Sequence, residues 1–64
     1  MEDYEERVIV EKSQLDEKLV SLISFMRTTG FVGLSGVEQG LLMVQLVAMK
    51  NYSEVLRRRI EAFK

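Results

Sequence analysis

The carboxyl-terminal half of the chain carries a seam of apolar residues spaced alternately four and three positions apart. The seam consists of Leu42, Leu46, Met49, Ser53, Leu56, Ile60 and Phe63, of which only Ser53 is polar. This spacing places every member on one side of an α-helix that packs lengthwise against a neighbour. A second apolar series lies beside the seam, at Val37, Leu41, Val44, Ala48, Tyr52 and Val55. The pattern predicts a helix over about 35–63 with more apolar surface than one partner helix can cover.

The amino-terminal segment has the same character. Apolar residues recur at helical spacing through Val8, Leu15, Leu19, Leu22 and Met26, and the segment contains no glycine or proline. This predicts a helix over about 2–27. Two glycines, Gly30 and Gly33, then interrupt the pattern and predict a loop over about 28–34. Ser35 followed by Glu38 fits a capping box at the start of the next helix.

Folding the two helices back on each other gives an all-α fold, an antiparallel two-helix hairpin that forms a single domain over residues 1–64. This arrangement pairs Leu22 with Leu42, and Val8 with Leu56, along one continuous seam. Lys12 interrupts the first stripe where Ser53 interrupts the second. Because both interruptions fall in the same layer, we expect Lys12 to face Ser53.

The half of the hairpin nearest the loop is poor in charge. Between Leu19 and Met49 the only charged residues are Arg27 and Glu38. Apolar surface on this scale is not expected to face water in a monomer. We therefore predict that copies of the chain join into a homo-oligomeric helical bundle, mainly through this half.

Composition excludes several classes of protein. The 64 residues include no Cys, His or Pro, and the net charge is −1. Without thiol or imidazole groups, the chain has neither a zinc-finger ligand set nor a thiolate nucleophile, and its carboxylates do not converge on a cleft. We expect no enzyme, no cofactor and no metal site. The longest apolar stretch, residues 41–49, is too short to cross a membrane and the acidic start lacks a secretory signal, so we expect the cytosol.

Arg57, Arg58 and Arg59 are consecutive, so they fan around a helix rather than form one patch. Three interpretations stay open for them: a solvated face paired with Glu54 and Glu61, contact with phosphate, and binding to duplex nucleic acid. The near-neutral charge speaks against the last, and duplex binding is not expected.

The tyrosines Tyr4 and Tyr52, one in each predicted helix, either pack in the core or interface or stack on a planar ring. Arg7 and Lys50 lie close to them in sequence, which would allow a site that combines rings with cations. In the loop, the hydroxyls of Thr28 and Thr29 precede a helix amino terminus, where an anion can bind. Helix capping is the alternative explanation for the loop.

A larger set of positions resembles a known group of proteins. The set consists of Tyr4, Arg7, Val8, Glu11, Leu15, Lys18, Leu22, Phe25, Leu34, Ser35, Glu38, Leu41, Leu42, Gln45, Leu46, Met49, Tyr52, Leu56, Arg59 and Ile60. It is similar to small bacteriophage helical-hairpin proteins of the crAssphage-related type. More loosely, size and plan resemble the phage anti-CBASS and anti-Thoeris sponges, which are helical homo-oligomers that sequester cyclic-nucleotide immune signals.

The resemblance implies a phage anti-defence protein that binds a cyclic oligonucleotide, or a related nucleotide, at pockets between subunits and without catalysis. In this role Tyr4 and Tyr52 would stack on bases. Phosphates would be neutralised by Arg7, Lys50, Arg57, Arg58 and Arg59, with Thr28 and Thr29 as hydroxyl donors. The alternative is a helical protein-interaction module that inhibits or bridges a host or phage protein and takes no small ligand.

Overall fold

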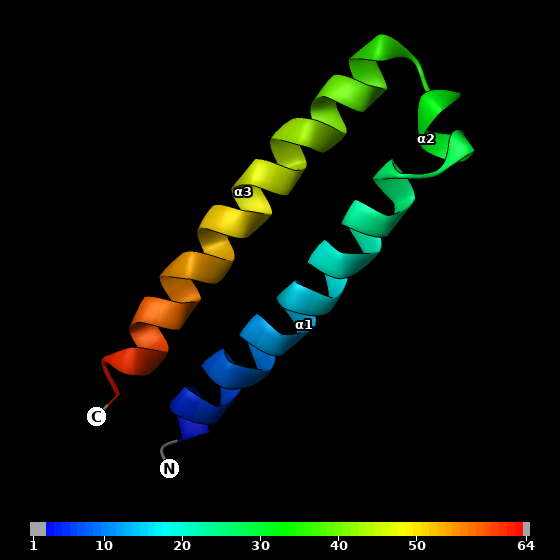
Figure 1. The fold of residues 1–64 in the computed structure, drawn as a ribbon. Coiled ribbons are helices and arrows are strands. Elements are labelled where there is room, and N and C mark those ends of the chain that lie inside the picture. The colour runs from blue at the N-terminus through cyan, green and yellow to red at the C-terminus, as the bar shows by residue number, and fades with distance from the viewer. Residues whose placement is uncertain (1–2, 64) are drawn as a thin grey trace.

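The computed structural model describes residues 3–63 of the chain as three helices. They are α1 (Asp3–Met26), the single-turn α2 (Thr29–Val32) and α3 (Gly36–Glu61). α1 and α3 lie side by side and run in opposite directions, with α2 at the turn between them (Figure 1). The all-helical fold that the sequence predicts is confirmed. The molecule is long and thin, with dimensions of 46 × 15 × 13 Å.

The core is a single strip between α1 and α3. Val8, Leu19 and Leu56 are the apolar side chains that are buried within the described residues, and Leu56 is 0% exposed. The other members of the seam are half-buried: Leu15, Leu22, Met26, Leu42, Leu46, Met49, Ile60 and Phe63. The seam therefore lies where its spacing places it, but one helix on each side cannot enclose it completely.

A polar layer interrupts this strip where the sequence predicts it. Lys12 Nζ donates to Ser53 Oγ at 3.2 Å and to Asp16 Oδ2 at 2.7 Å. Ser53 in turn donates its hydroxyl hydrogen to Asp16 Oδ1 at 2.6 Å. The hydrogen bonds from Lys12 and then Ser53 lower the pKa of the Asp16 carboxyl. A slip of one helix along the other would break these bonds, so the layer fixes the register of α1 against α3.

The helix limits follow from local capping. Ser35 accepts a hydrogen bond from the backbone N–H of Glu38 at 3.1 Å, as the predicted cap requires. Thr28 plays the same part for α2, because its hydroxyl accepts from the N–H of Phe31 at 3.4 Å. This cap explains why residues 29–32 form a helical turn within the predicted loop. The predicted start of the first helix at residue 2 lies outside the described residues.

Gln39 ties the turn to α3. Its side-chain nitrogen lies 3.1 Å from the carbonyl oxygens of Phe31, Val32 and Leu34. Phe31 also packs edge-on against Phe25 at the end of α1, with ring centroids 6.3 Å apart. The chain reversal is thus held by the amide side chain of Gln39 on α3 and by the aromatic pair that joins α1 to α2.

We expect Leu56→Ala to lower the free energy of unfolding by about 3 kcal/mol, because the change leaves a cavity at the most enclosed point of the seam. Val47→Ala is the control, since Val47 is 57% exposed and its truncation should cost less than about 0.5 kcal/mol. Urea titration followed by circular dichroism measures both values. Equal losses for the two variants would contradict the position of the core.

Candidate functional site

The predicted ligand residues occupy both ends of the helical pair. Thr28 and Thr29 lie at the turn end, beside α2, whereas Tyr4, Arg7 and residues 57–59 lie at the open end, where α1 begins and α3 ends (Figure 1). The two groups lie at opposite ends of a molecule that is 46 Å long. One chain therefore does not bring all of the predicted residues into a single site.

At the turn end, the threonines serve the backbone. The Thr28 hydroxyl donates to the carbonyl oxygen of Phe25 at 2.6 Å and accepts from the N–H of Phe31. Thr29 begins α2, and its carbonyl oxygen accepts from the N–H of Gly33 at 3.0 Å. Within the described residues, the Thr28 hydroxyl therefore acts as a cap and has already committed its hydrogen.

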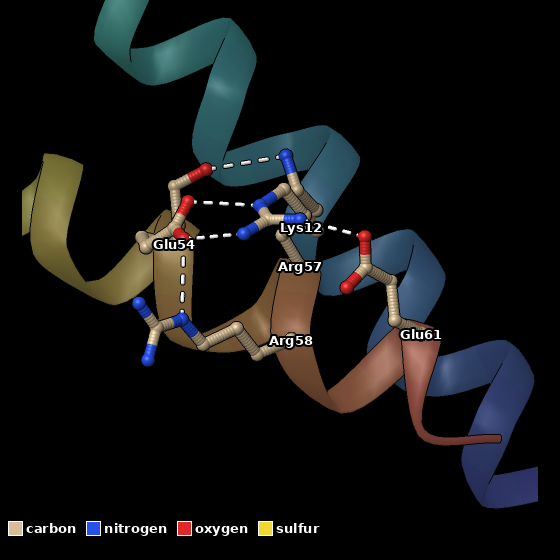
Figure 2. A network of polar contacts seen from close by, with 6 residues as sticks. Lys12, Glu54, Arg57, Arg58 and Glu61 are labelled. Carbon is tan, nitrogen blue, oxygen red and sulfur yellow. Dashed lines mark hydrogen bonds and ion pairs between the residues drawn. The ribbon is translucent and has the colours of Figure 1, made fainter.

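At the open end, Arg57 and Arg58 are engaged by acidic residues of their own helix. Arg57 donates two hydrogen bonds to Glu54, at 2.9 and 2.6 Å, and one to Glu61 at 2.6 Å (Figure 2). Arg58 Nε donates to Glu54 at 3.2 Å. The two guanidinium groups lower the pKa of the Glu54 carboxyl to about 2, and Glu54 in turn raises the pKa of Arg57. These contacts agree with the interpretation of a solvated, internally paired face.

Three other cations at the predicted positions are more available. Arg7 contacts Asp3 at 3.3 Å, with both side chains highly exposed, and such a pair is weak in water. Lys50 and Arg59 form no ion pair within residues 3–63. The guanidinium of Arg59 can therefore offer its donors to an anion without breaking an ion pair to another described residue.

Both tyrosines keep exposed ring surface. Tyr4 is 52% exposed and packs edge-on against Phe63, with ring centroids 5.6 Å apart. Tyr52 is 44% exposed, and its hydroxyl donates to a carboxylate oxygen of Glu11 on α1. Neither ring lies in the seam between the helices, so both can take part in contacts with another molecule.

The contact between Tyr52 on α3 and Glu11 on α1 identifies one side of the helical pair, and other candidate residues can be assigned to it. Residues seven positions apart lie on the same face of a helix, so Tyr4 shares the side of Glu11, and Arg59 shares the side of Tyr52. Because α1 and α3 run in opposite directions, and Tyr4 packs against Phe63 one turn beyond Arg59, Tyr4 and Arg59 lie at the same end of the pair. The structure thus gathers Tyr4, Tyr52 and Arg59 along one side of the pair.

The apolar series beside the seam lies on this same side of α3. We call it the Tyr52 face, and it consists of Val37, Leu41, Val44, Ala48, Tyr52 and Val55. Its larger members are exposed, from 44% for Tyr52 to 75% for Val37. The opposite side of the pair carries a shallow groove along α1, lined in part by Ile9, Lys12, Asp16 and Val20. The sequence did not predict this groove, whose polar lining includes Lys12 and Asp16 of the polar layer.

Other kinds of site find little support in the part of the chain that the structure describes. No group of three or more acidic residues there is arranged to hold a metal ion. None of the described helices combines the length and the apolar character needed to span a membrane. The described residues that are available for contact with another molecule are exposed rings, exposed cations and an apolar face.

Comparison with known proteins gives a family. The model of the Sequestin family matches residues 2–62. The chain is also 43% identical, over 61 residues and 95% of both chains, to a 7.5 kDa protein from the denB–rIIB intergenic region of Enterobacteria phage T4. No solved structure matches the chain. The phage origin of this relative agrees with the resemblance to small phage proteins.

We expect acid to remove the contribution of Glu54 to stability. Because its pKa falls from an ordinary 4.5 to about 2 in the folded chain, its ion pairs stabilise the fold above pH 4.5 and are lost as the pH falls through 2. Thermal melts of the unaltered chain and of Glu54→Gln, compared from pH 7 to pH 2, measure the effect. The difference between the two melting temperatures should shrink below pH 4.5, and a constant difference would contradict the assignment.

Proposed function

This chain belongs to the Sequestin family, and we propose that it is a phage protein that sequesters a nucleotide signal of host defence. The ligand class is a cyclic oligonucleotide or a related nucleotide, held in the host cytosol at pockets shared between copies of the chain. The ligand is bound without turnover. The name of the family and the phage origin of its relative support sequestration as the general activity.

The observation that carries the proposal is the placement of exposed rings on the same side as a cation that forms no ion pair within residues 3–63. Tyr4 and Tyr52 lie on the same side of the helical pair as Arg59, and each tyrosine leaves about half of its surface open. A nucleotide presents planar bases and anionic phosphates, for which stacking rings and guanidinium groups are the usual partners. Arg7, whose contact with Asp3 is weak, adds a second cation at the same end.

A shared pocket follows from the shape of the molecule. Two helices side by side enclose no deep cavity, and small-molecule sites are concave. The turn residues Thr28 and Thr29 can approach Arg59 only if they come from another copy, because the chain is 46 Å long. In such a pocket Lys50 and the paired Arg57 and Arg58 would act mainly through their charge.

The apolar Tyr52 face supports a second candidate function. An exposed apolar strip on a helix is also the surface that protein-interaction modules present to a groove on another protein. In this role the chain would inhibit or bridge a host or phage protein and take no small ligand. Binding to a nucleotide separates the two functions.

We expect one member of a panel of cyclic dinucleotides, cyclic trinucleotides and cyclic ADP-ribose isomers to stabilise the protein against heat. At a concentration of about one hundred times its dissociation constant, a ligand adds about 2.7 kcal/mol to stability. Ligand released from the heated complex should be chemically unchanged by chromatography and mass spectrometry. Stabilisation by no member of the panel would contradict the proposal, and a converted ligand would point to an enzyme.

For the ligand found in this way, Tyr4→Ala and Arg59→Gln should each weaken binding about tenfold, because each removes one stacking or charge contact. Tyr4→Phe keeps the ring and should bind within about twofold of the unaltered chain. Lys18→Gln is the matched control, since Lys18 lies in the middle of α1 and away from both ends that the shared pocket combines. Isothermal titration calorimetry measures the affinities. Equal losses for the Arg59 and Lys18 variants would argue against this pocket.

A further inference from the structure

The Tyr52 face is an apolar surface that stays exposed in the part of the chain that the structure describes. Val37 is 75% exposed, Leu41 59%, Val44 67% and Val55 52%. Ala48 lies at the middle of the face and has the smallest side chain there. A strip of this length, continuous over five turns of α3, is the kind of surface that a second helix covers.

The two ends of the face carry opposite charges. Glu38 follows Val37 in the first turn of α3, and Arg59 lies one turn beyond Val55 in the last. Neither side chain forms an ion pair within residues 3–63. The face therefore has an acidic end, an apolar middle and a basic end. When a second copy lies against it in the opposite direction, each acidic end meets a basic end.

We propose that the Tyr52 face is the docking surface for a second copy of this chain, with the two α3 helices antiparallel about a two-fold axis between Val44 and Ala48. A two-fold axis at this place sets Val44 beside the partner's Ala48 and Val37 beside the partner's Val55. Leu41 then lies level with the partner's Asn51 and one position from the partner's Tyr52, so Asn51 is the polar residue among otherwise apolar layers. Because the surface is self-complementary, two copies close the assembly at this face.

The same arrangement brings Glu38 towards the partner's Arg59. Side chains on a helix tilt towards its amino terminus. In antiparallel helices this tilt directs the Glu38 carboxylate and the partner's Arg59 guanidinium towards each other, and symmetry makes the contact twice. An arginine has five N–H donors, so Arg59 can hold the carboxylate and still offer donors to a phosphate.

The shape of the molecule leaves surface to cover. The chain exposes 4867 Å², about 650 Å² more than a compact chain of 7.4 kDa, because it is a thin rod. The docking goes beyond the proposed function, because it requires no nucleotide and would hold if none binds.

Light scattering on a size-exclusion column, without nucleotide, tests the surface. We expect the unaltered chain to elute with at least twice its chain mass, and Val44→Lys to elute as a single chain. Val20→Lys is the matched control, because Val20 is 65% exposed and lies in the groove with Asp16, on the opposite side of the pair. Circular dichroism checks that each variant stays helical. A single-chain mass for the unaltered protein, or equal effects of the two variants, would overturn the proposal.

Charge exchange tests the orientation of the two copies. Glu38→Arg and Arg59→Glu should each weaken self-association about tenfold, because two like-charge contacts replace two ion pairs. The double variant should recover the affinity to within about threefold. Each change also places an unfavourable charge at an end of the α3 dipole. If the losses in affinity came only from this effect on the helix, the double variant would lose the most. Lys50→Glu, on another face, is the control, and a double variant weaker than either single one would overturn the antiparallel arrangement.

Discussion

Packing of one apolar seam between α1 and α3 is the interaction on which the rest of the molecule depends. Two helices can bury only one strip each, and here Val8, Leu19 and Leu56 are the apolar residues that become buried within the described part of the chain. α3, however, carries a second strip, the Tyr52 face, which no other long helix covers within residues 3–63. Because the fold has only one seam between two long helices, part of its apolar surface stays exposed.

The charged side chains also differ between the buried seam and the exposed surface. The Lys12–Asp16–Ser53 layer lies in the seam and fixes the register of the helices. Glu54 and Glu61 engage Arg57, which leaves Arg59 as the arginine of this run without an ion pair in residues 3–63. A cation in this position, beside two half-exposed tyrosines, suits recognition of an anion with planar rings. Sequestration requires nothing more, because it asks for affinity and not for chemistry on the ligand.

Spacing in the sequence predicted the helices, the seam and the Lys12–Ser53 layer, because residues that repeat every three or four positions must share one helix face. It did not predict α2, which depends on one hydrogen bond from Phe31 to Thr28, or the role of Gln39, which depends on how the turn folds back. For the candidate site, residue type alone could not show which of Arg57, Arg58 and Arg59 is more available to bind an anion. Their difference arises from which of them lies within reach of Glu54 and Glu61.

Chemical cross-linking gives the most direct test of whether a second copy covers the Tyr52 face. The chain has no cysteine, so Gln45→Cys places a single thiol beside the two-fold axis and Val20→Cys places one on the opposite side. With a short bismaleimide and no nucleotide, we expect the Gln45→Cys variant to link two copies rapidly and the Val20→Cys variant to link few. Equal linking of both variants, or none of the Gln45→Cys variant, would contradict docking at the Tyr52 face.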